Sequence, residues 1–93
     1  MHEMGIACSV LEAVDRETRR HPGHRAVKVG LRIGEYAGVD PESLRFCFEA
    51  IAKADGLAPL VLDFEWCKAS EGRRGDELDL AFVELEDAEE GAT

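Results

Sequence analysis

The chain has 93 residues, 45% of them hydrophobic and 33% charged, which suits a single globular domain. Its formal net charge of −9 argues against nucleic-acid binding, which needs clustered lysines and arginines, and disfavours an anionic membrane surface. No apolar run approaches the roughly 20 residues of a membrane helix, and the first residues lack the basic segment of a signal peptide. We therefore expect a cytoplasmic protein.

The first half of the chain contains three clear elements. Apolar residues at helical spacing predict a helix over residues 4–20, which the Pro22-Gly23 turn ends. Strict alternation predicts a strand over residues 26–35, with glycines leaving room on its second face. Asp40 and Pro41 are typical of a helix start, and Asp55-Gly56 is typical of its end.

The second half predicts two strands, over residues 60–66 and 77–86. In the second of these, the apolar residues change phase, so we expect a bulge near Phe82. A polar loop over residues 67–76 joins the two strands, which we expect to pair antiparallel. The fold class is α/β: a two-layer domain in the order α-β-α-β-β, with two helices on one face of a small three-stranded sheet. Residues 87–93 should form a flexible acidic tail.

The cysteines and the tryptophan have ordinary explanations. Cys8, Cys47 and Cys67 include no Cys-x-x-Cys pair, so we expect reduced thiols, with Cys8 and Cys47 partly buried. Trp66 ends a strand; a core position is expected ahead of a partner contact. No phosphate loop and no nucleophile beside a base is present, so the sequence contains no sign of an enzyme.

The most distinctive chemistry lies in the first three residues. The Met1 amine and the His2 amide can close a five-membered ring on a metal ion, and the His2 amide and imidazole a six-membered ring. Glu3 offers another amide nitrogen or a carboxylate. In-plane nitrogen donors suit Ni(II) or Cu(II), whereas Zn(II) prefers tetrahedral sites. An amino-terminal histidine also occurs by chance in chains that bind no metal.

Four segments are informative as a set: the initial Met1-His2-Glu3, VGLRIGE at residues 29–35, GVDPESLRFCFE at 38–49 and GDELDL at 75–80. In this order and spacing, they resemble the HypA/HybF family. The resemblance implies an accessory factor that inserts nickel during [NiFe]-hydrogenase maturation. It places the nickel ligands at Met1, His2 and Glu3, with Asp40 as a weaker candidate whose ordinary role is the helix cap. It also implies two partners, a HypB-type GTPase and the hydrogenase large subunit.

The sequence departs from the family in one respect. Family members carry a zinc domain with two Cys-x-x-Cys pairs between the last two strands, and here the loop over residues 67–76 holds only Cys67. We therefore interpret residues 1–86 as the nickel-binding domain alone and expect no structural zinc. A metal-independent adaptor for the same partners is the alternative function, and service to another nickel enzyme such as urease is a third. The chain should be a monomer or a weak homodimer.

Overall fold

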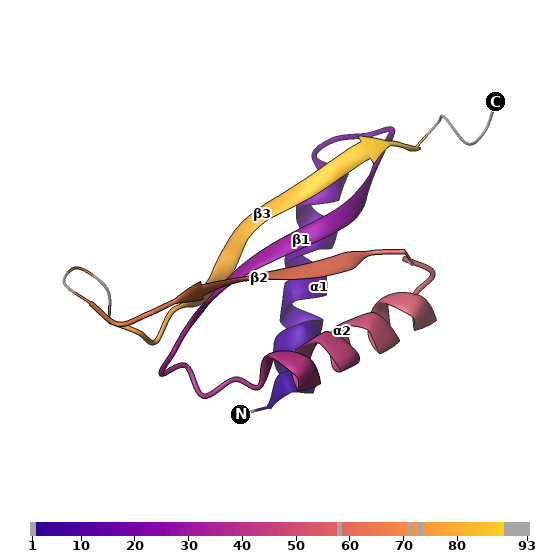
Figure 1. Ribbon diagram of the computed structural model, residues 1–93. Coiled ribbons are helices and arrows are strands. Elements are labelled where there is room, and N and C mark those ends of the chain that lie inside the picture. The colour runs from indigo at the N-terminus through magenta and orange to yellow at the C-terminus, as the bar shows by residue number, and fades with distance from the viewer. Residues whose placement is uncertain (1, 58, 71, 73, 89–93) are drawn as a thin grey trace.

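The computed structural model describes residues 2–57, 59–70, 72 and 74–88. Two helices, α1 (Glu3–Arg19) and α2 (Pro41–Ala54), lie on the same side of a sheet of three strands, β1 (His24–Gly34), β2 (Val61–Cys67) and β3 (Leu78–Asp87) (Figure 1). The predicted order and the two-layer α/β architecture are therefore confirmed. Of the predicted acidic tail, residues 89–93 lie outside the described residues, while Asp87 ends β3 and the Ala88 amide donates to the Gly23 carbonyl (2.8 Å).

The strand pairing differs from the prediction. The sheet order is β2-β1-β3, so β1 is central, pairs parallel with β2 and antiparallel with β3. The prediction that the last two strands pair with each other is wrong. Helix α2 connects β1 to β2 as a crossover, the connection that parallel strands require. The segment after β2 then passes the end of β1 before β3 begins.

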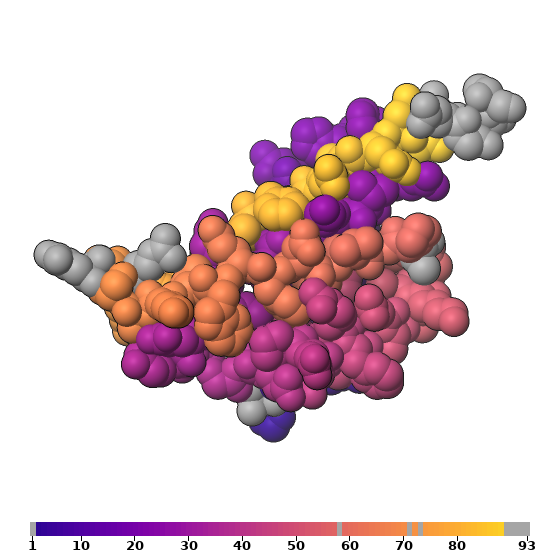
Figure 2. Space-filling view, viewed as in Figure 1, coloured from indigo at the N-terminus to yellow at the C-terminus, as the bar shows by residue number. Residues whose placement is uncertain are grey.

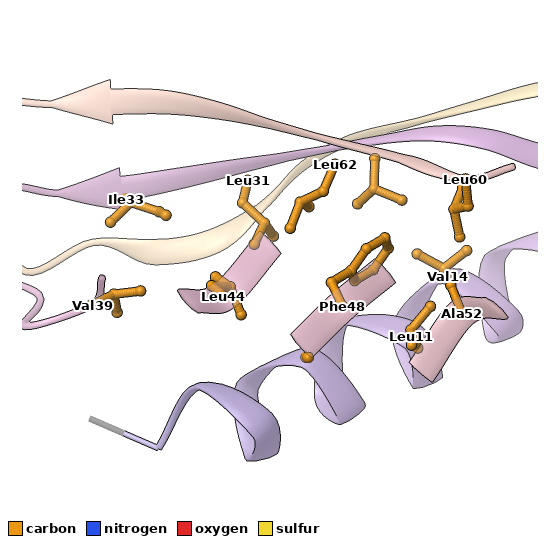
Figure 3. Packing of buried hydrophobic residues seen from close by; sticks show 12 residues of the cluster. Leu11, Val14, Leu31, Ile33, Val39, Leu44, Phe48, Ala52, Leu60 and Leu62 are labelled. Atoms are coloured by element: carbon orange, nitrogen blue, oxygen red, sulfur yellow. The ribbon is translucent and has the colours of Figure 1, made fainter. Parts of the chain in front are cut away.

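The core lies between the helices and the inner face of the sheet (Figure 3). Helix α1 buries Ala7, Leu11 and Val14, and α2 buries Leu44, Phe48 and Ala52. Strand β1 presents Val29, Leu31 and Ile33 to them, as its alternation predicts. Truncation of a fully buried residue such as Phe48 to alanine would lower the free energy of unfolding by about 3–5 kcal/mol.

Gly30 of β1 explains how the outer face of the sheet is filled. A Cβ at Gly30 would lie 2.1 Å from the Phe82 ring, so this ring packs directly on the glycine. The pairing register shifts between Gly30 and Leu31, where β3 carries an extra residue, which confirms the expected bulge near Phe82. The bulge lets Leu80 and Val83 both pack against the core.

The segment after β2 is fixed to the end of β1. Gly34 donates to the Glu77 carbonyl (2.7 Å), Glu35 to the Cys67 carbonyl (2.9 Å) and Tyr36 to the Gly75 carbonyl (2.6 Å). Figure 2 shows this segment packed against the turn that follows β1, at one end of the molecule. The two ends of this loop therefore form a junction with the end of β1.

Candidate metal centre

The structure places His2 at the start of α1, where its imidazole is free to act as a ligand. His2 is exposed and is the N-cap residue of the helix, but its side chain makes no capping hydrogen bond. Its carbonyl accepts the first helical bond, from Ile6 (3.1 Å). Met1, the other predicted ligand of this segment, lies outside the described residues.

Glu3 and Asp40, which are far apart in the sequence, lie together. The Asp40 amide donates to Glu3 Oε2 (3.3 Å), which ties the first turn of α1 to the start of α2. The first turn of α1 accordingly lies beside the start of α2 in Figure 1. A carboxylate has about four lone-pair sites, so Glu3 keeps acceptor capacity beyond this one bond.

The Asp40 side chain is engaged in capping α2. Its Oδ1 accepts from the amides of Glu42 (3.1 Å) and Ser43 (3.5 Å), and its Oδ2 accepts from the Ser43 hydroxyl (3.3 Å). Both carboxylate oxygens therefore already hold hydrogen bonds within the helix start. The predicted cap is confirmed, and a metal ion would have to compete with it.

Helix α1 leaves the amide nitrogen of Glu3 without an intrahelical acceptor, because the first N–H groups of any helix have none. A metal that displaces the proton of such an amide breaks no helical bond. The positive end of the helix dipole also favours the negative charge that amide deprotonation creates. The helix start is thus chemically suited to backbone coordination.

No side-chain cluster competes with this segment. Within the described residues, no group of three or more His, Cys, Asp or Glu side chains could hold a metal ion. Cys67 is buried, with its Sγ 3.8 Å from the Glu65 carbonyl, while Cys8 is exposed and Cys47 half-buried. The prediction that Cys8 is partly buried is wrong. Three separated thiols do not fit a tetrahedral zinc site with four thiolate ligands.

The other two histidines, His21 and His24, lie at the other end of α1. The rings of His21 and His24 are 6.4 Å apart between centroids. His21 faces Glu17 (Nε2 to Oε1, 3.5 Å), and His24 Nδ1 lies 3.3 Å from the Pro22 carbonyl. Each imidazole thus has its own polar neighbour, a carboxylate of α1 in one case and a carbonyl of the following turn in the other.

Comparison with known proteins places the chain in a family. Residues 1–84 match the family described as "Hydrogenase/urease nickel incorporation, metallochaperone, hypA". The chain belongs to the HypA family. Relatives named hydrogenase maturation factor HypA come from Pelodictyon phaeoclathratiforme (45% identity over 65 residues), Chlorobium limicola (48% over 65) and Rhodopseudomonas palustris strain TIE-1 (46% over 73). No solved structure matches the chain.

The match to HypA proteins is partial in length. The match covers 70% of this chain and 56% of each relative from P. phaeoclathratiforme and C. limicola. For the R. palustris relative, it covers 72% of this chain and 65% of the relative. The chain thus spans little more than half the length of the first two. Among the described residues, no helix of this HypA domain is long and apolar enough to cross a membrane.

Proposed function

We propose that this HypA domain binds one Ni(II) ion at its amino-terminal segment and delivers it to the large subunit of a [NiFe]-hydrogenase. The ligands are the Met1 amine, the His2 amide and imidazole, and a donor from Glu3, with Asp40 as an auxiliary donor. The observation that carries the proposal is the exposed, uncapped His2 at the start of α1 in a chain of the nickel-incorporation family.

The chemistry of this segment accounts for both selectivity and pH dependence. Nitrogen donors in two fused chelate rings favour a planar geometry, which Ni(II) accepts and Zn(II) resists. The amide must give up its proton to bind, so nickel affinity should rise from pH 6 to pH 8. All donors lie within three residues, so chelation orders very little chain.

The position of the segment suits transfer of a cargo ion. His2 is exposed, and a chain end can approach a second protein without disturbing the core. Ligand exchange then takes the ion directly from this segment to an acceptor site. The partners that we propose are the hydrogenase large subunit and a HypB-type GTPase, and the domain itself catalyses no reaction.

Nickel titration of the untagged protein tests the assignment. His2→Ala should abolish tight binding, and one residue added before Met1 should do nearly as much damage because it replaces the amine with an amide. His24→Ala is the matched control, since it removes an exposed histidine at the other end of α1. If His2→Ala binds Ni(II) as strongly as the unaltered protein, the ligand assignment is wrong.

A metal-independent adaptor is the second candidate. It is favoured by the three separated cysteines, which leave this chain without the thiolate set of a zinc domain. The adaptor would bind the GTPase or the hydrogenase subunit equally well with His2→Ala and would show only weak nickel affinity. Service to urease, which the family description also names, would appear as nickel transfer to apo-urease in place of the hydrogenase subunit.

A further inference from the structure

The two edges of the sheet are not equivalent. Along β2, the Arg45 side chain of α2 donates to the Leu62 carbonyl (3.0 Å) and lies over the Phe64 ring (4.8 Å to its centroid). This contact covers part of that edge. Strand β3 has β1 on one side and, within the described part of the chain, no strand on the other.

The backbone of β3 presents hydrogen-bonding groups to this open side. Gly34 of β1 donates to the Glu77 carbonyl (2.7 Å), and bonded positions alternate along an antiparallel pair. The N–H and C=O groups of Leu78 and Leu80 therefore point away from β1. An open edge with such groups is a template for another strand.

An apolar groove of about 450 Å³ runs between β3 and the neighbouring face of α1. On the helix side, Ile6, Ser9, Val10 and Ala13 line it. On the sheet side, Leu31, Leu78 and Leu80 line it together with Asp79. A strand added to β3 would place every second side chain on this inner side of the sheet, where the groove can take apolar groups.

The outer face of β3 is mainly acidic. It carries Asp79, Glu84 and Glu86 together with Phe82, and the strand contains no lysine or arginine. On the β1 side, Arg32 lies 3.3 Å from the Asp79 carboxylate, and Arg25 Nε donates to the Glu86 carboxylate (2.7 Å). Among the described side chains, Glu84 has no ion-pair partner. Cross-strand neighbours on this face should therefore be basic.

We propose that the groove and the open edge of β3 bind an extended segment of a partner protein in which apolar residues alternate with lysine or arginine. The segment adds a fourth strand, with its apolar side chains in the groove and its basic side chains beside Glu84. A second copy of this chain is a poor occupant, because antiparallel pairing of two β3 strands would set acidic residues against acidic residues. The proposal does not depend on nickel, although His2 lines one end of the groove.

A synthetic peptide tests the surface directly. The probe is a capped ten-residue peptide that alternates valine with lysine, matched to the ten residues of β3. Its control alternates serine with lysine and so has the same charge without an apolar face. At about 0.15 M salt, where long-range attraction is screened, the first should bind at least tenfold more tightly. It should also slow hydrogen exchange at the amides of Leu78 and Leu80.

Paired variants separate the groove from general electrostatics. Ser9→Trp fills the groove and should weaken binding at least tenfold, whereas Ala50→Trp on the exposed side of α2 should not. Glu84→Lys should weaken binding far more than Glu49→Lys, which changes the net charge equally on α2. Circular dichroism confirms that each variant is folded.

The proposal is overturned if both lysine variants weaken peptide binding equally, or if folded Ser9→Trp binds the peptide as well as the unaltered protein. Exchange protection at β2 in place of β3 would also overturn it. The protein with one residue added before Met1, which removes the amine ligand of the nickel proposal and changes no side chain of the groove, should keep peptide affinity within threefold of the unaltered protein; a larger loss would also overturn the proposal. Failure of nickel binding in the same protein leaves this surface intact, so the two proposals fail separately.

Discussion

Replacement of Gly34 by alanine should destabilise the domain strongly. The new Cβ would lie 2.2 Å from the Gly75 carbonyl oxygen, 2.3 Å from its carbon and 2.7 Å from the Glu77 nitrogen. All three are backbone atoms, so no side-chain rotation relieves the overlap. The segment after β2 would have to move away from β1.

The size of the effect follows from the bonds that this movement strains. The bonds from Gly34 to the Glu77 carbonyl and from Tyr36 to the Gly75 carbonyl both cross the contact, and each contributes about 1 kcal/mol. With the lost packing around Gly34, which is buried, we expect a loss of about 2–3 kcal/mol. For a domain of this size, that lowers the melting temperature by about 8–24 °C.

Gly5→Ala is the matched control. A Cβ at Gly5, within α1, meets nothing within 4 Å, and alanine favours a helix over glycine by about 0.5–1 kcal/mol. Identical substitutions should therefore change the free energy of unfolding in opposite directions. Urea denaturation followed by far-ultraviolet circular dichroism measures both. A Gly34→Ala protein as stable as the unaltered chain would refute the junction that we describe.

Three further predictions concern the site and its surroundings. Asp40→Ala should lower stability by about 1 kcal/mol through loss of the cap while reducing nickel affinity no more than about threefold, as urea melts and nickel titration will determine. A thiol reagent should label exposed Cys8 first, half-buried Cys47 more slowly and buried Cys67 only on unfolding. Cys67→Ser should leave nickel affinity unchanged. A tenfold loss of nickel affinity, about 1.4 kcal/mol, would place a ligand in the loop. Thermal melts with and without a strong chelator should coincide, and a drop of many degrees on chelation would reveal a structural metal.

Local signals made the elements predictable. Asp40 and Pro41 set the start of α2, and Asp40 caps the amides of Glu42 and Ser43 as the residue types suggest. Gly56 has a φ of 73° and ends that helix, as expected for a glycine in the left-handed region. The apolar residues change phase at Phe82, and this change indicated a bulge. Only an extra residue allows the apolar residues before and after that point to lie on the same face of the sheet.

Strand order was not predictable from the same signals. The short connection between β2 and β3 suggested a hairpin, but β1 offers the most regular apolar face and takes the central position. Trp66 is the last residue but one of the edge strand β2, which has a strand on one side only within the described residues. It is 48% exposed, so the expected core position is wrong. Alternation along a strand identifies its faces without identifying its neighbours.

The candidate site was predictable only in part. Residue types suggested Met1, His2 and Glu3 as candidate donors, and the structure describes His2 as exposed. The contact between the Glu3 carboxylate and the Asp40 amide depends on how α1 and α2 pack, which no local pattern encodes. The same is true of the groove beside β3, which forms from residues distant in the sequence.

The junction at the end of β1 has a consequence for how such domains can change in evolution. Cys67 and Glu77 bond to the adjacent residues Glu35 and Gly34, so the chain leaves and re-enters the sheet at two fixed, neighbouring points. The entropic cost of closing a loop increases by only about 0.6 kcal/mol for each doubling of its length. A whole module could be gained or lost between these points for little more than 1 kcal/mol, with the sheet, the helices and the amino terminus left in place.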